Sequence, residues 1–230
     1  MKRTFWAPLL LAVFGMTFCC GGAPVKSAAQ QKREMVDLIE HKTIALVIPT
    51  EEDLSVMKPY CSGVWVDDDK ILTAFHCVND NDLLIYEVVG DEDGIVRMTY
   101  LSDVDPDNDL ALLVTDPRST PKHPVAKIAD VAWDGEHVNI VGHTSGLWWT
   151  FIEGVVSSTR ASITNDKGKL PKSIQVSSPA WFGNSGGGAF DDDGKLVGIS
   201  SWISTRAPMM SFFIHRDALF KFLSKKTSGP

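Results

Sequence analysis

Short apolar segments separated by turn residues run through most of this 230-residue sequence, and they restrict the folds open to it. These segments are rich in β-branched side chains, which favours strands. The expected strands are residues 43–48, 63–66, 71–73, 83–89, 95–101, 110–114, 137–141, 151–158, 173–176, 188–190, 196–202 and 211–214. Only residues 215–224 space their apolar side chains for a helix, and residues 35–40 are expected to form a short helical turn. We therefore predict an all-β fold that ends in a helix.

A proline-rich stretch divides the expected strands into two groups. Residues 116–124 carry three prolines among polar side chains, which is typical of a connection between folded units. We therefore expect an N-terminal unit at about 43–115, a linker at 116–126, a C-terminal unit at about 127–214 and the terminal helix at about 215–225.

The first residues have the order of charge and hydrophobicity that export requires. Lys2 and Arg3 precede an almost wholly apolar run over 5–18, and small residues follow over 21–29. We predict a signal peptide over 1–22, with cleavage as late as residue 29; an N-terminal core helix is the alternative. The apolar run is too short to span a bilayer comfortably, so no stable membrane insertion is expected once it is removed.

The location that follows from this leader is the periplasm or the outside of the cell. Adjacent Cys19 and Cys20 leave open a lipid-anchored N-terminus, although Phe18, and not a small residue, precedes them. Residues 23–34 are polar and small, so we expect a flexible connector there, followed by a folded domain over 35–230.

Composition excludes one class of partner and gives no sign of a cofactor. The formal charge of −7 and the pI near 5.3 oppose nucleic-acid binding, which needs clustered Lys and Arg to neutralise phosphates. The histidines show no metal-ligand spacing, and the aspartates at 103, 105, 107 and 109 lack the glycine of an EF-hand loop. We predict no metal and no other cofactor.

Two cysteines remain when the leader is removed, Cys61 and Cys77. An even number in an oxidising compartment predicts a disulfide between them. Two buried free thiols are the alternative.

Ser185 lies in the glycine-rich segment FGNSGGG, residues 182–188. Glycines on both sides let the backbone turn sharply and let a substrate carbonyl approach closely. Such a loop can also aim amide N–H groups at the oxygen on which negative charge develops during peptide cleavage. The sequence therefore predicts Ser185 as a nucleophile, with the amides of Gly183 and Ser185 as an oxyanion hole.

A serine nucleophile needs a nearby base, and the base needs a carboxylate to orient it. His76, in the segment LTAFHC, is the best base, and Asp109, directly ahead of the apolar run 110–114, is the best carboxylate. Each signal alone also fits a turn, a structural histidine or a cap. Together, in the order His76, Asp109, Ser185, they predict a catalytic triad.

These segments resemble those of the trypsin-like serine proteases. They are CSG at 61–63, TAFHC at 73–77, DLALL at 109–113, GNSGG at 183–187 and LVGI at 196–199, and the resemblance covers nearly all of the chain after the leader. It implies two packed six-stranded β-barrels with the triad in the cleft between them. It also implies a protease domain over 35–230 that hydrolyses polypeptides through an acyl-enzyme intermediate.

Within that superfamily the sequence is most similar to the periplasmic HtrA (Deg) proteases, through DP at 105–106, VG at 141–142 and GVVS at 154–157. This similarity makes unfolded proteins candidate substrates. Because the sequence ends soon after the terminal helix, we expect no PDZ domain. Asn184 replaces the aspartate that captures a new N-terminus in the digestive enzymes, so we expect the site to form without zymogen cleavage.

The resemblance also assigns substrate contacts. Ser201, Trp202 and Ile203 would form the edge on which an extended substrate adds as an antiparallel strand. Pro179, six residues before Ser185, would lie at the base of the primary specificity pocket, where it offers no charge. With Ile203 at the entrance, the pocket would favour small or medium apolar residues before the scissile bond.

Two other functions compete with a serine endopeptidase. The stronger is a catalytically silent homologue that binds peptides in the same cleft. An esterase is less consistent, because the chain lacks the α/β alternation and the nucleophile elbow of that fold.

Overall fold

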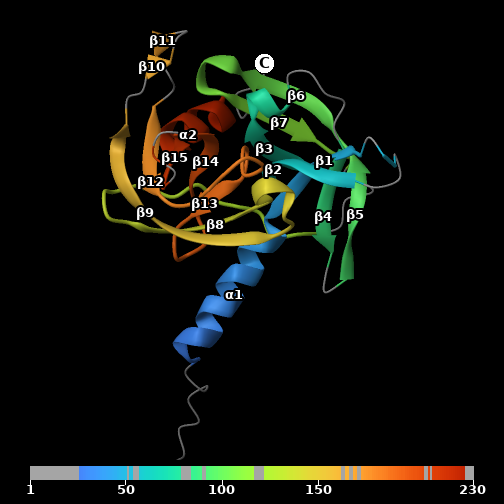
Figure 1. Cartoon of the computed structure of the whole chain (residues 1–230), viewed down its shortest axis with the longest axis horizontal. Helices are drawn as coiled ribbons and strands as arrows, with labels where there is room; N and C mark the ends of the chain where they lie inside the picture. Colours follow the sequence, from blue (N-terminus) through green and yellow to red (C-terminus); the bar gives the residue numbers. More distant parts are fainter. Residues whose placement is uncertain are drawn as a thin grey trace, which may run out of the picture.

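The computed structural model describes residues 26–50, 52–53, 57–78, 84–89, 92–116, 122–161, 164–165, 168–169, 172–204, 207 and 209–225. They form two strand-rich halves, with one helix ahead of the first and another after the second (Figure 1). The expected signal peptide, Cys19 and Cys20, and residues 117–121 of the expected linker lie outside these residues. Within the described ranges, no helix is long and apolar enough to cross a membrane.

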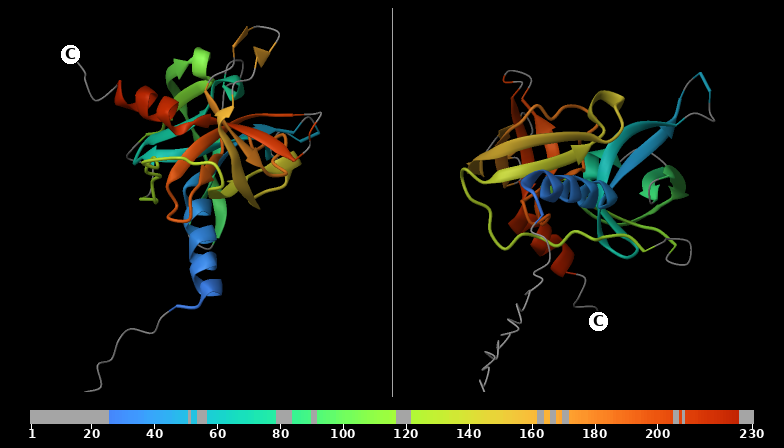
Figure 2. Two further views of the ribbon diagram at one scale, coloured as in Figure 1. Left: turned by 90° about the vertical axis from the view of Figure 1, so that its left-hand side faces the viewer. Right: turned by 90° about the horizontal axis from the view of Figure 1, so that it is seen from below.

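The first helix, α1 (Ala28–His41), occupies residues where we expected mainly a flexible connector. Its N-terminus forms a capping box, in which Ser27 Oγ accepts from the Gln30 N–H and the Gln30 side chain accepts from the Ser27 N–H. The residues that follow are mostly strong helix formers, and their polarity concealed the helix. Residues 28–34 are therefore helical and not a connector. Seen from below, α1 lies under the junction of the two halves (Figure 2).

The first half is a sheet of seven strands in the order β5-β4-β1-β2-β3-β7-β6. Its strands are β1 (Thr43–Pro49), β2 (Met57–Asp67), β3 (Lys70–Ala74), β4 (Leu84–Val89), β5 (Glu92–Met98), β6 (Tyr100–Asp105) and β7 (Leu110–Val114). The resemblance implied a barrel of six. The seventh strand arises because the segment expected as one strand over 95–101 is divided at Thr99. β5 and β6 are the two edge strands of the sheet, and Thr99 is the single residue that connects them. The sheet must therefore curl until its two edges lie close together.

The second half is a closed barrel of six strands in the order β12-β15-β14-β13-β8-β9. Its strands are β8 (His137–Gly142), β9 (Thr150–Ala161), β12 (Ser173–Ser177), β13 (Gly188–Phe190), β14 (Leu196–Ile203) and β15 (Met210–His215), and a short hairpin pairs β10 (Thr164–Asn165) with β11 (Gly168–Lys169). The final helix, α2 (Arg216–Ser224), buries Leu219 and Phe222. The all-β class and the C-terminal helix are confirmed.

A shared apolar core fixes the two halves against each other. One cluster of buried side chains combines Val64, Leu72 and Leu110 from the sheet with Val141, Phe190 and Ile199 from the barrel. Because both halves contribute to one close-packed core, the loops that each half presents at the junction keep fixed positions.

Candidate active site

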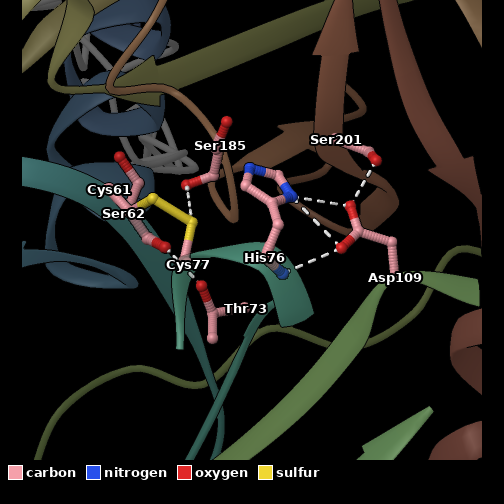
Figure 3. Close-up of polar contacts among 8 residues, drawn as sticks. All are labelled: Cys61, Ser62, Thr73, His76, Cys77, Asp109, Ser185 and Ser201. Atoms are coloured by element: carbon pink, nitrogen blue, oxygen red, sulfur yellow. Dashed lines mark hydrogen bonds and ion pairs between the residues drawn. A yellow bond between two sulfur atoms is a disulfide. The ribbon is translucent and has the colours of Figure 1, made fainter. Parts of the chain in front are cut away.

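His76 and Asp109 meet because their strands pair. The antiparallel pairing of Ala74 with Leu110 places the end of β3 beside the start of β7. His76 follows β3 in a single 3-10 turn, and Asp109 directly precedes β7. The His76 Nδ1 atom lies 2.9 Å from Asp109 Oδ2 and 3.1 Å from Oδ1 (Figure 3). The main-chain N–H of His76 also donates to Oδ1, at 3.0 Å.

The Asp109 carboxylate is held by a third donor. The Ser201 hydroxyl donates to Asp109 Oδ2 at 2.5 Å, across the junction from β14 (Figure 3). Asp109 itself is left-handed, with φ 53° and ψ 43°, a conformation that aspartate tolerates better than most residues. An imidazole, a main-chain amide and a hydroxyl therefore orient one carboxylate. The sequence predicted Ser201 at the cleft but gave no sign of its bond to Asp109.

Ser185 lies in the turn between β12 and β13, with left-handed glycines at 183 and 186. Its carbonyl oxygen accepts from the Ser62 N–H at 2.7 Å, which ties this turn to β2. His76 and Ser185 line one cleft, and the imidazole lies between Ser185 and Asp109 in Figure 3. No hydrogen bond joins Ser185 Oγ to His76 here. Such bonds often tighten only when a substrate is bound.

The two amide N–H groups that we predicted as an oxyanion hole belong to this turn. Among the described residues, the N–H groups of Gly183 and Ser185 make no hydrogen bond, whereas those of Gly186 and Gly187 donate to Ser200 O and Asn184 O. Glycine is required at 183, because a Cβ there would lie 2.2 Å from the His143 carbonyl oxygen. The two amides that we predicted as an oxyanion hole are thus free to bind an oxygen.

The cleft has a volume of about 510 Å³, and aromatic and apolar side chains line much of it. Around His76 and Ser185 these are Tyr60, Trp181, Phe182, Trp202 and Ile203. Trp202 is fixed by stacking on Phe212, with ring centroids 3.9 Å apart. Tyr60, Trp181 and Phe182 carry no sequence signal of a binding site and were not predicted.

Pro179 is not brought to the cleft. It is exposed, while its neighbours Ser178 and Ala180 are buried, so the chain turns its side chain outward at this position. Of the four residues assigned to substrate binding, Ser201, Trp202 and Ile203 line the cleft and Pro179 does not.

A disulfide joins Cys61 to Cys77 beside the catalytic candidates. The Cys77 sulfur lies 3.7 Å from Ser185 O but, being oxidised, has no proton to donate (Figure 3). Cys61, His76 and Cys77 place one potential ligand atom each within 4.8 Å of the others. Because both sulfurs are bonded to each other, neither is a thiolate, and this group does not suit a metal ion.

The structure also buries Asn184 within the turn. Its side-chain amide donates to Thr144 Oγ1 at 2.7 Å, and the residue is 1% exposed. The neutral side chain is therefore anchored locally through its amide nitrogen. That the turn forms without zymogen cleavage stays a prediction.

Comparisons with known proteins point to one family. The family model described as "Trypsin-like peptidase domain" matches residues 61–199. A protein named probable periplasmic serine endoprotease DegP-like, from Pseudomonas fluorescens, is 33% identical over 140 residues, which cover 61% of this chain and 28% of that protein. The mitochondrial serine protease HTRA2 of Bos taurus is 30% identical over 216 residues, which cover 89% of this chain and 45% of that protein.

Solved structures show the same fold. The active form of the Rv3671c protease from M. tuberculosis superposes with a TM-score of 0.71 at 18% identity, covering 100% of this chain and 95% of the other. The serine endoprotease from Yersinia pestis gives a TM-score of 0.66 at 23% identity, covering 88% of this chain and 67% of the other. By contrast, the chain spans less than half the length of the two curated relatives.

Proposed function

Because this chain belongs to the trypsin-like peptidase family, we propose that it is an exported serine endopeptidase, periplasmic or secreted, that hydrolyses polypeptides through Ser185, His76 and Asp109. One observation carries the proposal. The imidazole of His76 is oriented by Asp109, in the same cleft as Ser185 and two unpaired amide N–H groups.

In the acylation step, Ser185 Oγ attacks the carbonyl carbon of the substrate while its proton passes to His76 Nε2. Asp109 stabilises the resulting imidazolium by accepting a hydrogen bond from its Nδ1–H. The former carbonyl oxygen, now negatively charged, is bound by the N–H groups of Gly183 and Ser185. His76 then returns the proton to the leaving amine, the C–N bond breaks, and the acyl group stays on Ser185.

Deacylation repeats these roles with water as the nucleophile. His76 removes a proton from the water, whose oxygen attacks the acyl carbon, and returns the proton to Ser185 Oγ as the ester bond breaks. Before the first step, the Ser185 hydroxyl must approach His76 Nε2. A rotation about the Cα–Cβ bond of Ser185 is the smallest movement that redirects it.

The cleft suits an extended, apolar peptide. β13 pairs with β14 only as far as Ile199, so residues 201–203 keep one edge open for an added strand. Apart from His76, the side chains that line the cleft carry no ionisable charge near neutral pH, which disfavours Arg or Lys before the scissile bond. Ile203 and the aromatic rings instead favour small or medium apolar residues there, and unfolded proteins offer such segments.

A fluorophosphonate probe tests the nucleophile directly. The purified chain should be labelled and should cut an unfolded protein, whereas Ser185→Ala should not label and should lose about a millionfold in turnover. Ser157→Ala, at an exposed serine of β9, is the matched control and should behave as wild type. A folded wild-type chain that neither labels nor cuts would instead indicate a silent, peptide-binding homologue.

A further inference from the structure

A second histidine, His143, is buried behind the turn that carries Ser185. We propose that His143 positions the oxyanion hole through Ser62, by a chain of two hydrogen bonds that ends on the carbonyl of Gly183. This inference rests on the proposed function and assigns positioning residues to it. Neither side chain touches the substrate.

His143 is held as a neutral ring. It is fully buried, and it makes T-shaped contacts with two tryptophans. Its ring centroid lies 4.6 Å from that of Trp149 and 5.7 Å from that of Trp148. Burial lowers the pKa of His143 to about 3, so the ring carries a single proton at any working pH. Which nitrogen holds that proton is decided by the neighbours of the ring.

The neighbours allow one direction of proton donation. The Ser62 Oγ atom lies 2.8 Å from Gly183 O and 3.0 Å from His143 Nδ1. A carbonyl oxygen can only accept, so the Ser62 hydroxyl donates to Gly183. Ser62 Oγ is then left to accept, and the donor must be Nδ1–H of His143. Nε2 is consequently the unprotonated nitrogen, which agrees with its having no hydrogen-bond partner among the described residues.

The bond to Gly183 completes a set of three. The carbonyls of three successive residues, Phe182, Gly183 and Asn184, accept from Ser145 N–H at 2.6 Å, from Ser62 Oγ at 2.8 Å and from Gly187 N–H at 2.8 Å. In a trans peptide the N–H points away from the C=O. Holding the Phe182 and Asn184 carbonyls therefore directs the Gly183 and Ser185 amides, which are the two donors of the oxyanion hole.

The middle peptide sets the angle between those two donors. It joins the peptide that carries the Gly183 N–H to the peptide that carries the Ser185 N–H, and Gly183, at φ 97°, has no side chain to restrict it. Main-chain amides hold the two outer carbonyls, and a side chain holds the middle one. The N–H of the middle peptide, that of Asn184, donates to Trp181 O at 3.1 Å. Ser62 Oγ therefore fixes the carbonyl end of a peptide whose other end is bonded to the main chain, and a single substitution can remove this hydroxyl.

Kinetics of variants test this role. Ser62→Ala and His143→Phe should each lower kcat by about tenfold or more with KM changed less than twofold, because a misaligned donor is lost only from the transition state. His143→Asn, which can offer an amide donor near the Nδ1 position, should recover part of kcat. Thr43→Val is the matched control, since it removes an equally buried hydroxyl that donates to a backbone carbonyl, Ile39 O, in the first half. It should leave kcat unchanged.

A spectroscopic readout tests the same chain without turnover. In protein labelled with ¹⁵N-histidine, His143 should show a protonated Nδ1 and an unprotonated Nε2, unchanged between pH 8 and pH 5. The opposite tautomer would overturn the inference, as would Ser62→Ala with wild-type kcat. If the wild-type chain itself neither labels nor cuts, the proposed function fails and takes this inference with it; wild-type activity with insensitive variants removes the inference alone.

Discussion

His76 and His143 both lie beside the turn that carries Ser185, but their surroundings differ. The His76 side chain is 45% exposed in the cleft, and a carboxylate holds its Nδ1. The His143 ring is fully buried, and its only hydrogen-bond partner among the described residues is the Ser62 hydroxyl. A carboxylate beside an accessible ring stabilises the charged form during proton transfer, whereas burial without a carboxylate keeps the ring neutral. In the proposed function the same kind of side chain moves protons at one site, and in the proposed inference it fixes a backbone at the other.

Among changes that separate the two histidine sites, the largest effect should come from removing the charge of Asp109. Asp109→Asn should lower kcat by about 10⁴-fold, because an amide can donate to His76 Nδ1 and so select the wrong tautomer. Asp107→Asn, at an exposed aspartate two residues earlier, is the control and should retain activity. Steady-state kinetics on both variants, with circular dichroism to verify folding, would decide. A decrease smaller than tenfold in Asp109→Asn would mean that His76 does not depend on this carboxylate.

The sequence predicts that His76, Asp109 and Ser185 lie together, and it gives no indication of the site around His143. His76, Asp109 and Ser185 each lie in a short segment whose neighbours indicate the position, namely a strand end or a glycine-rich turn. His143 and Ser62 are 81 residues apart, and neither lies in a pattern that indicates contact. Their bond exists only because the barrel and the sheet share a core. The hydrogen bond from Ser201 to Asp109, which is 92 residues away, was missed for the same reason.

The fold shows the same limit. Alternation and turn residues predicted most strands, because those signals act within a few residues. The division of one expected strand at Thr99 depends on the rolling of the whole sheet, which no local pattern records. The first part of helix α1 was missed for a different reason: its polar residues were interpreted as a connector ahead of a short helical turn at 35–40, although the Ser27 and Gln30 capping box was present in the sequence.

The two histidine sites also differ in covalent support. His76 is adjacent to Cys77, whose disulfide to Cys61 closes a loop with a sequence separation of 16, whereas His143 is held by packing and by its hydrogen bond to Ser62. Replacing both cysteines by alanine should lower the free energy of unfolding by about 3 kcal/mol, mainly through the greater entropy of the unfolded chain. Urea unfolding would measure this. An unchanged midpoint would show that the disulfide adds nothing to the stability of the His76 region.

A pH test isolates the buried ring. The pKa of His143 is lowered to about 3 in the folded chain, so between about pH 6.5 and pH 3 the unfolded chain binds the extra proton. Stability is therefore complete above pH 6.5 and decreases as the pH falls. His143 should account for a loss of about 2 kcal/mol between pH 7 and pH 5, and His143→Asn should remove that part. If urea unfolding shows the same pH dependence in both proteins, His143 is not buried as a neutral ring.

The smallest effect should come from Ser201→Ala, which removes one of three donors to the Asp109 carboxylate. His76 keeps both its imidazole and its main-chain bonds to Asp109, so kcat should fall by only about tenfold, equivalent to ~1.4 kcal/mol. KM for a peptide substrate should change little, because the backbone edge at residues 201–203 remains. A larger rise in KM than fall in kcat would place the Ser201 hydroxyl in substrate binding. The Asp109 carboxylate would then be oriented by two donors, the imidazole and the main-chain N–H of His76.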